Sequence, residues 1–359
     1  MEGEVVYLFI YSVGTNLNRE QIKGLLKNPE DFSKYEYTKP TPEEMATFST
    51  PYIFNLKDET LKLKDSSFKF KVQASIYETG TFSIRIRHPF TDADTGLLAK
   101  LAFDKEVNDL VKGIALKARS IVERNLSKVK NIKPAERSET YMLYYIKGEK
   151  RDILKKNEKV IIGLLIDEPD PNELDPSYID EVAKKQISYN SSDVFYVGWE
   201  AAVMIDNVSS YEHELIITEI ANVQLLQLMI FHEEVSKKIK DSDKLISEIS
   251  AGRKGRSELK KLNYTLSEFY DSTRDMTTSV NDTISGFGEW YLLRLYSLFD
   301  DVLKISPIRK SIESDLGIID KRRDFVSDEI RSSQSDLLEW IIVVLIIIEV
   351  VLEIGYLLK

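Results

Sequence analysis

The stretch from Leu337 to Lys359, LLEWIIVVLIIIEVVLEIGYLLK, decides how this chain is interpreted. Between Leu337 and Leu358 it contains no Lys or Arg, and sixteen of the 22 positions are Leu, Ile or Val. A helix of this length spans about 30 Å, the thickness of the hydrocarbon core of a bilayer. We therefore expect residues 337–358 to form one transmembrane helix, a tail anchor that leaves the rest of the chain on one side of the membrane.

Three carboxylates interrupt this apolar run, at Glu339, Glu349 and Glu353. On a helical wheel with Glu339 at zero, Glu349 lies at about −80° and Glu353 at about −40°, so the three share one stripe. Two acids deep in the span oppose insertion by about 5–7 kcal/mol, nearly as much as the apolar residues favour it. A second copy of the helix would cover the stripe, which predicts a homo-oligomer. The alternative is a soluble oligomeric bundle with the tail buried and the stripe facing water.

Composition limits the remaining classes of protein. The chain has 359 residues and no Cys, which excludes disulfides and thiolate chemistry. Its net charge of −10 disfavours wholesale nucleic-acid binding, and 30% charged residues exclude a multispanning membrane protein. Lys321, Arg322, Arg323 and Arg331 precede the apolar run, and this bias predicts a single-pass protein of the cytoplasmic membrane with its bulk in the cytosol.

Residues 1–206 are expected to form an α+β domain, because strand and helix patterns follow one another without regular alternation. Strict alternation of apolar and polar residues on either side of Glu78-Thr79-Gly80 predicts a β-hairpin. The other expected elements are a strand at 4–12, a helix at 18–26, helices over 96–129 interrupted near Asp104, strands at 141–146 and 160–166, a helix at 178–186, and strands over 194–205 folded at Gly198.

The polar face of this hairpin carries Lys69, Lys71, Arg85 and Arg87. Cross-strand neighbours lie about 5 Å apart, so these side chains are expected to form a local basic patch on an acidic protein. Such a patch suits a ribosome, RNA or anionic lipid headgroups as a partner. The alternative is a solvated sheet face without a partner.

Residues 207–336 show the periodicity of long helices that pack as an antiparallel coiled-coil-like bundle. Ser209 and Glu212 have the spacing of a capping box that opens a helix running to about residue 249. The next helix, over 257–305, is expected to break at 285–288 and to end at Pro307. The last helix would then continue into the apolar tail.

The segment LGIIDKRRDFVSDEIRSSQSDLLEWIIVVLIIIEVVLEI, residues 316–354, resembles the C-terminal signature of the "required for meiotic nuclear division" family, here as a prokaryotic-type member. The resemblance implies an α+β part, a coiled-coil part and a C-terminal hydrophobic helix, together with membrane anchoring and self-association. For the mitochondrial members it implies a supporting role in organelle translation. It carries over no catalytic residues.

No catalytic constellation is evident. His213 and His232 lie about 28 Å apart on one expected helix, so they cannot share a metal. The acidic loop 167–175 lacks the spacing of a calcium loop and is expected to be stiff and solvated. We therefore expect no cofactor, metal site, catalytic residue or small-molecule substrate. The expected function is a non-enzymatic membrane-anchored scaffold or adaptor, with a membrane tether for ribosome or RNA as the alternative.

Overall fold

A computed structural model describes residues 1–14, 16–24, 34–35, 51–63, 66–91, 95–126, 132, 134–251, 257–285 and 289–357, and all that follows concerns these residues. The chain divides into two compact units, which are described separately. The first comprises Met1–Ile230 and Val280–Ile308, and the second comprises Phe231–Ser279 and Arg309–Lys359. The division therefore falls inside a helix and differs from the expected boundary after residue 206.

The first unit is built on a mixed sheet in the order β2-β3-β5-β6-β1-β7-β10-β9-β8, and β4 also pairs with β5. Every pair is antiparallel except β7 with β10, which are connected through the intervening helices. The strands are β1 (Glu2–Ser12), β2 (Lys34–Tyr35), β3 (Tyr52–Asn55), β4 (Glu59–Leu63), β5 (Ser66–Ile76), β6 (Thr81–Phe90), β7 (Glu139–Lys147), β8 (Gln186–Ile187), β9 (Val194–Val197) and β10 (Ala201–Asp206).

One face of the sheet is covered by α2 (Thr95–Phe103), α3 (Lys105–Leu126) and α4 (Lys150–Ile166). Alternate residues of the strands, such as Val5 and Tyr7 of β1, enter a core with the apolar stripe of α3. Asp104 separates α2 from α3 where the sequence predicted an interruption. Its carboxylate accepts hydrogen bonds from the backbone N–H groups of Glu106 (2.9 Å) and Val107 (3.1 Å), which caps α3.

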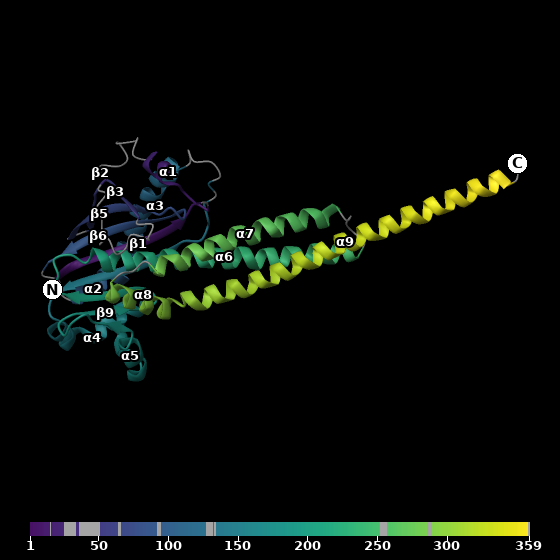
Figure 1. The fold of residues 1–359 in the computed structure, drawn as a ribbon. Coiled ribbons are helices and arrows are strands. Elements are labelled where there is room, and N and C mark those ends of the chain that lie inside the picture. The colour runs from purple at the N-terminus through teal and green to yellow at the C-terminus, as the bar shows by residue number, and fades with distance from the viewer. Residues whose placement is uncertain are drawn as a thin grey trace. The chain divides into compact units, whose positions relative to one another are not determined.

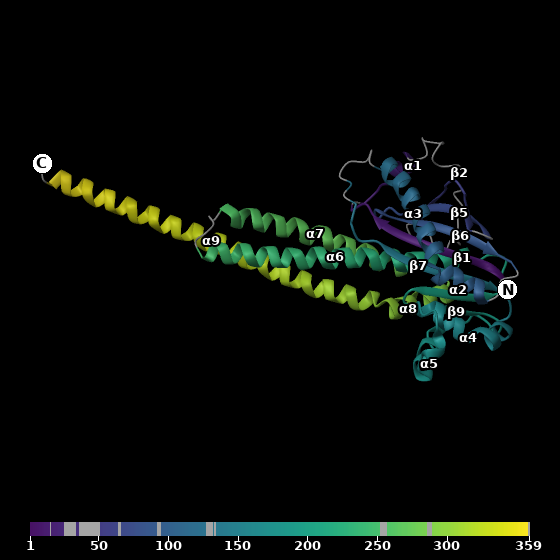
Figure 2. The ribbon, with the colours of Figure 1, turned by 180° about the vertical axis from the view of Figure 1, so that it is seen from behind.

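The other face of the sheet is covered by the start of α6 (Glu212–Ser250) and by α8 (Trp290–Leu303). Figure 1 shows the start of α6 lying along the sheet, and Figure 2, seen from behind, shows α3 crossing it. Residues 215–228 of α6 are buried on every side. The first unit is thus a sheet between two helical layers, and the predicted α+β class, with a mixed sheet followed by a long helical region, is confirmed.

Several predicted elements are confirmed with shifts at their ends. They include the hairpin, in which Val72 pairs with Ile86 and Lys71 with Arg87. They also include the second hairpin of β9 and β10, α1 (Arg19–Gly24) and α5 (Pro176–Ala183). A short 3-10 turn at Pro171–Glu173, which follows α4, lies in the segment predicted as a loop. α7 (Ser257–Ser285) and α8 are separate helices, because Glu289, just before α8, has an extended backbone. The predicted break at 285–288 falls mostly outside the described residues. Residues 252–256 and 286–288 lie outside the described part of the chain.

Two local predictions are wrong. The run VIIGLLI was predicted as a strand over 160–166, but it is the second half of α4. A short apolar run does not distinguish a buried strand from a buried helix, and Ile153 and Leu154 upstream complete a helical stripe that packs on the core. Pro307 does not end a helix. Lys304 ends α8 with a left-handed φ of 57°, and Pro307 lies in the first turn of α9 (Ile305–Leu357), where proline is tolerated.

The second unit consists of parts of α6, α7 and α9, which run side by side in Figures 1 and 2. His232 of α6 contacts Asp315 of α9, and further along both helices Asp243 contacts Arg322, so α6 and α9 run in the same direction. α7 runs opposite to α9. Tyr270 of α7 contacts Arg323 of α9, whereas Asn263, earlier in α7, contacts Ser327, later in α9.

Candidate functional site

The four cations predicted to form a basic patch on the hairpin are not equally exposed. Lys69 and Lys71 are exposed, but Arg85 is fully buried and Arg87 is only 15% exposed at its side chain. The start of α6 lies on this face and supplies carboxylates to both arginines. The expectation of an exposed patch of four cations is therefore corrected: two exposed lysines remain.

Arg85 belongs to a buried ion pair between the sheet and α6. The Arg85 Nε donates to Glu219 Oε1 at 2.9 Å, and the Arg85 Nη2 donates to Glu219 Oε2. The Tyr77 hydroxyl also donates to Glu219 Oε2, at 2.7 Å. Burial alone would lower the pKa of Arg85, but Glu219 raises it above its usual value. Burial would likewise raise the pKa of Glu219, and Arg85 holds it below its usual value. Both groups stay charged.

Arg87 makes a second, half-buried ion network at the start of α6. Its Nη1 donates to Glu212 Oε1 at 2.6 Å, and its Nη2 donates to Glu4 Oε2 at 2.7 Å. The ring of Tyr211 stacks on Tyr145 with centroids 4.5 Å apart, and Arg87 lies 5.6 Å from its centroid. The network ties the start of α6 to β1, β6 and β7.

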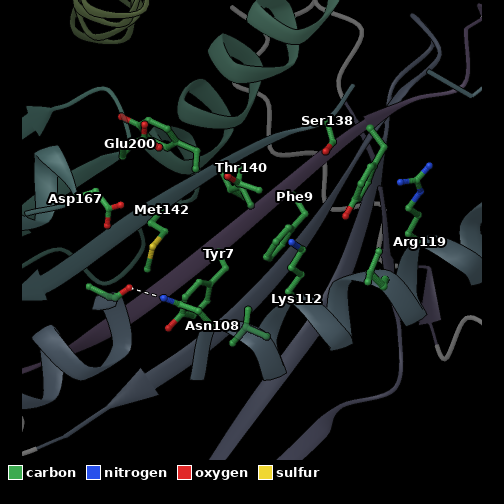
Figure 3. A pocket seen from close by; sticks show the side chains of 16 residues that line it. Tyr7, Phe9, Asn108, Lys112, Arg119, Ser138, Thr140, Met142, Asp167 and Glu200 are labelled. Carbon is green, nitrogen blue, oxygen red and sulfur yellow. Dashed lines mark hydrogen bonds between the residues drawn. The ribbon is translucent and has the colours of Figure 1, made fainter. Parts of the chain in front are cut away.

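A pocket of about 520 Å³ lies on the opposite face of the sheet, between α3 and the end of α4 (Figure 3). Its floor is formed by β1 and β7, which are paired so that Tyr7 faces Met142 and Phe9 faces Thr140. One wall is α3, with Lys112 and Arg119. The opposite side carries Asp167, at the left-handed end of α4, and Glu200, in the turn between β9 and β10.

The predicted carboxylate stripe lies on α9, which continues without a break through the apolar run. Glu339 and Glu349 are exposed, whereas the side chain of Glu353 lies outside the described residues. The side chains from Leu338 to Val350 are all exposed, including Trp340 at 70%. Among the described residues, a different helix meets the length and hydropathy of a membrane span: it covers Glu212–Ile249, and 78% of its most apolar window is buried.

The other groups considered in the sequence do not converge on a catalytic or metal centre in the described part of the chain. No group of three or more His, Asp or Glu there could hold a metal ion. Ser311 Oγ and Asp315 Oδ2 lie 3.5 and 3.7 Å from the same atom, Nε2 of His232. A catalytic triad needs the two partners on different ring nitrogens, so this cluster lacks the geometry of one.

Glu219 and the pocket were missed by sequence reasoning. Glu219 is the one charged residue between Leu215 and Phe231, and a lone charge in an apolar helix signals a buried partner. The sequence offered no comparable signal for the pocket, because Asp167 and Glu200 lie about 55 and 90 residues after Lys112 in the chain and only the fold brings them near it.

Glu214, in the first turn of α6, provides a prediction of pH dependence. Burial, followed by the nearby Asp206, Glu289 and Asp193, raises the pKa of Glu214 to about 7, against an ordinary value of 4.5. Because the folded-state pKa is raised, this group stabilises the fold at low pH, and the contribution is lost as the pH rises from about 4.5 through 7. The urea concentration at the midpoint of unfolding should decrease as the pH is raised from 5.5 to 8. In Glu214→Gln this decrease should be smaller. An unchanged pH slope in the variant would contradict the assignment.

Comparison with known proteins places the first unit in a family. A family model described as "Uncharacterized protein MJ0711, N-terminal domain" matches residues 2–212, which include the whole sheet and the pocket. A protein of Methanocaldococcus jannaschii described as "Uncharacterized protein MJ0711" is 24% identical over 264 residues, which cover 73% of this chain and 80% of that protein. No solved structure matches. The family model covers more than half of this chain, so the chain belongs to the family of the MJ0711 N-terminal domain, an uncharacterised family.

Proposed function

We propose that this protein is a non-enzymatic scaffold of the cytoplasmic membrane, anchored by the helix over residues 337–358 with its bulk in the cytosol. The observation that carries the proposal is the exposure of the apolar run on α9. Ile341 to Ile348 are eight consecutive Ile, Val and Leu residues, and each of them is 46–59% exposed. An exposed apolar surface of this extent marks a contact with lipid or with another protein.

The charges that flank the run support the orientation. Lys321 and Arg331 are both exposed, and both precede the apolar run in the chain. A cationic segment before the span favours the cytosolic side of the membrane. The resemblance of residues 316–354 to the "required for meiotic nuclear division" family supports the same anchor. That segment lies outside residues 2–212, so the family match bears only on the N-terminal domain.

Self-association forms the second part of the proposal. An isolated helix with Glu349 near the middle of the bilayer loses about 2.5–3.5 kcal/mol of insertion free energy for that carboxylate. Packing against the same stripe of a second copy would remove Glu339 and Glu349 from lipid. The soluble alternative, an oligomeric bundle in which copies bury the run against each other, makes the same prediction about oligomers and a different one about membranes.

The tether to a ribosome or RNA is the weaker proposal. With Arg85 and Arg87 bound to carboxylates, the exposed cations of the hairpin are Lys69 and Lys71. Each basic residue near an anionic surface contributes about 1 kcal/mol, so two of them provide little affinity. Loss of ribosome co-sedimentation in a Lys69→Glu, Lys71→Glu variant would support the tether.

A single charge on the apolar run tests the anchor. Val344 is 46% exposed and lies about 140° around the helix from Glu349, so a lysine there cannot pair with that carboxylate. Val344→Lys should weaken insertion by about 2.5–3.5 kcal/mol and move much of the chain from carbonate-washed membranes to the supernatant. The measurement is the fraction of the full-length chain that remains in the washed membrane.

Phe325→Lys is the matched control, since Phe325 is 52% exposed on the same helix before the apolar run. This variant should stay in the membrane as the unaltered chain does. If the unaltered chain itself washes off, the anchor is refuted and the soluble bundle replaces it. Equal retention of both lysine variants would also contradict insertion of this segment.

A further inference from the structure

The pocket of Figure 3 is an open groove with an apolar floor. Phe9 and Met142 are partly exposed in it, while Tyr7 beneath them is 3% exposed. The groove lies entirely within the first unit, away from the face that α6 covers. Its volume of about 520 Å³ is within the range of sites that enclose small organic molecules.

The wall formed by α3 presents a solvent-exposed cation, Lys112, to the groove. Asn108, Lys112, Leu116 and Arg119 follow one another at helical spacing and line the groove. Arg119 is occupied: its Nε donates to Glu123 Oε1 at 2.7 Å, and its guanidinium lies 4.6 Å from the ring centroid of Tyr11. Lys112 forms no ion pair with any residue of the described chain. Lys117, one turn further and outside the groove, does have a partner in Glu59.

The opposite side of the groove presents two carboxylates. Asp167 is held there by the left-handed turn that ends α4, where φ is 57°, and Glu200 by the tight turn that joins β9 to β10. Neither has a cationic partner among the described residues. Burial raises the pKa of Glu200, and its neighbour Asp167 raises it further. Burial also raises the pKa of Asp167. A bound cation would relieve the repulsion between the two groups.

We propose that this groove binds a small zwitterion with an apolar body, whose carboxylate meets Lys112 and whose ammonium lies between Asp167 and Glu200. A purely apolar ligand would leave all three charges unpaired, and a polyanion would be repelled by the two carboxylates. A short apolar peptide has the required pattern of charge at its two ends, and Phe9 and Met142 offer its side chains an apolar surface. The inference is independent of the membrane anchor.

The dipeptide L-Phe-L-Leu is the probe, titrated calorimetrically into the full chain in a non-ionic detergent. Its N-acetyl form lacks the ammonium, and its C-terminal amide lacks the carboxylate. Saturable binding of the free dipeptide is expected, with each capped form binding about tenfold more weakly, because each loses a charge-assisted hydrogen bond. Absence of saturable binding by the free dipeptide, or equal binding of all three forms, would overturn the proposal.

Three variants locate the site. Lys112→Met should abolish the preference for the free carboxylate, and Glu200→Gln should reduce the preference for the free ammonium. Asp167→Asn should act as Glu200→Gln does, since asparagine tolerates the left-handed backbone of this position. Lys117→Met is the matched control on the same helix and should bind as the unaltered chain does. Equal effects of Lys112→Met and Lys117→Met would show that the dipeptide binds elsewhere and would overturn the assignment.

Discussion

Replacement of Arg85 by methionine should lower the free energy of unfolding by about 3–5 kcal/mol. Arg85 and Glu219 are both fully buried at their side chains, and they face each other between β6 and α6. Removing the guanidinium leaves a buried carboxylate that keeps the Tyr77 hydroxyl as a donor but has lost its charged partner. Most of the decrease in the free energy of unfolding therefore comes from the buried, unpaired charge of Glu219, and less of it from the lost packing of the arginine side chain.

The double variant Arg85→Met, Glu219→Leu separates these contributions. Apolar residues of similar volume restore much of the stability of a buried ion pair, so the double variant should unfold at a higher urea concentration than Arg85→Met alone. The control is Lys261→Met, which removes an exposed partner of Glu258 at 3.0 Å and should cost less than about 1 kcal/mol. Additive losses in the cycle, or a small loss for Arg85→Met, would show that this pair does not hold α6 to the sheet.

Phe299→Ala should also destabilise the first unit by about 3–5 kcal/mol. Phe299 of α8 is completely buried and meets the rings of Tyr141 and Phe195 at centroid distances of 6.0 Å, both near edge to face. Truncation to alanine removes these two aromatic contacts and leaves a cavity. Because the two rings belong to β7 and β9, the cavity cannot close without moving the sheet or the helix.

Trp290→Ala provides the control for Phe299→Ala on the same helix. Trp290 is 69% exposed, with Arg294 lying over its ring at 4.7 Å, and its loss should change the stability by less than about 1 kcal/mol. Urea denaturation followed by far-UV circular dichroism measures both variants without relying on tryptophan fluorescence. Equal losses in the two variants would contradict the role of Phe299 in joining α8 to the sheet.

Local patterns were sufficient to predict the hairpin and the α+β class. The alternation over β5 and β6 fixed both the strands and their pairing, because a shift by one residue would expose Phe70 and Val72. Residues 160–166 of α4 were predicted as a strand because an apolar run of seven residues is compatible with either a buried strand or a buried helix. Periodicity decides between the two only when the charged first half of that helix is included.

The placement of Arg85 could not be predicted from β6 alone. Alternation assigns a residue to one of two faces, but it does not show whether the second face meets solvent or another layer. The layer that covers it begins more than 120 residues later, in α6, and the clue to it is Glu219 in an otherwise uncharged apolar stretch. Glu219 indicates that a cation meets this part of α6, but the pattern does not choose among Lys69, Lys71, Arg85 and Arg87. The groove beside Lys112 depends on the spacing of α3 and α4, which no local pattern encodes.

The most direct test of the anchor uses the absence of cysteine from the chain. Val344→Cys and Phe325→Cys each introduce one thiol on α9, inside and before the apolar run, at positions 46% and 52% exposed. Native membranes carrying each variant are treated with a charged maleimide, and labelling is compared with that after denaturation in SDS. The account predicts that Cys at 325 reacts in the membrane and that Cys at 344 reacts only after denaturation. Equal reaction of both thiols in native membranes would show that the helix does not enter the bilayer.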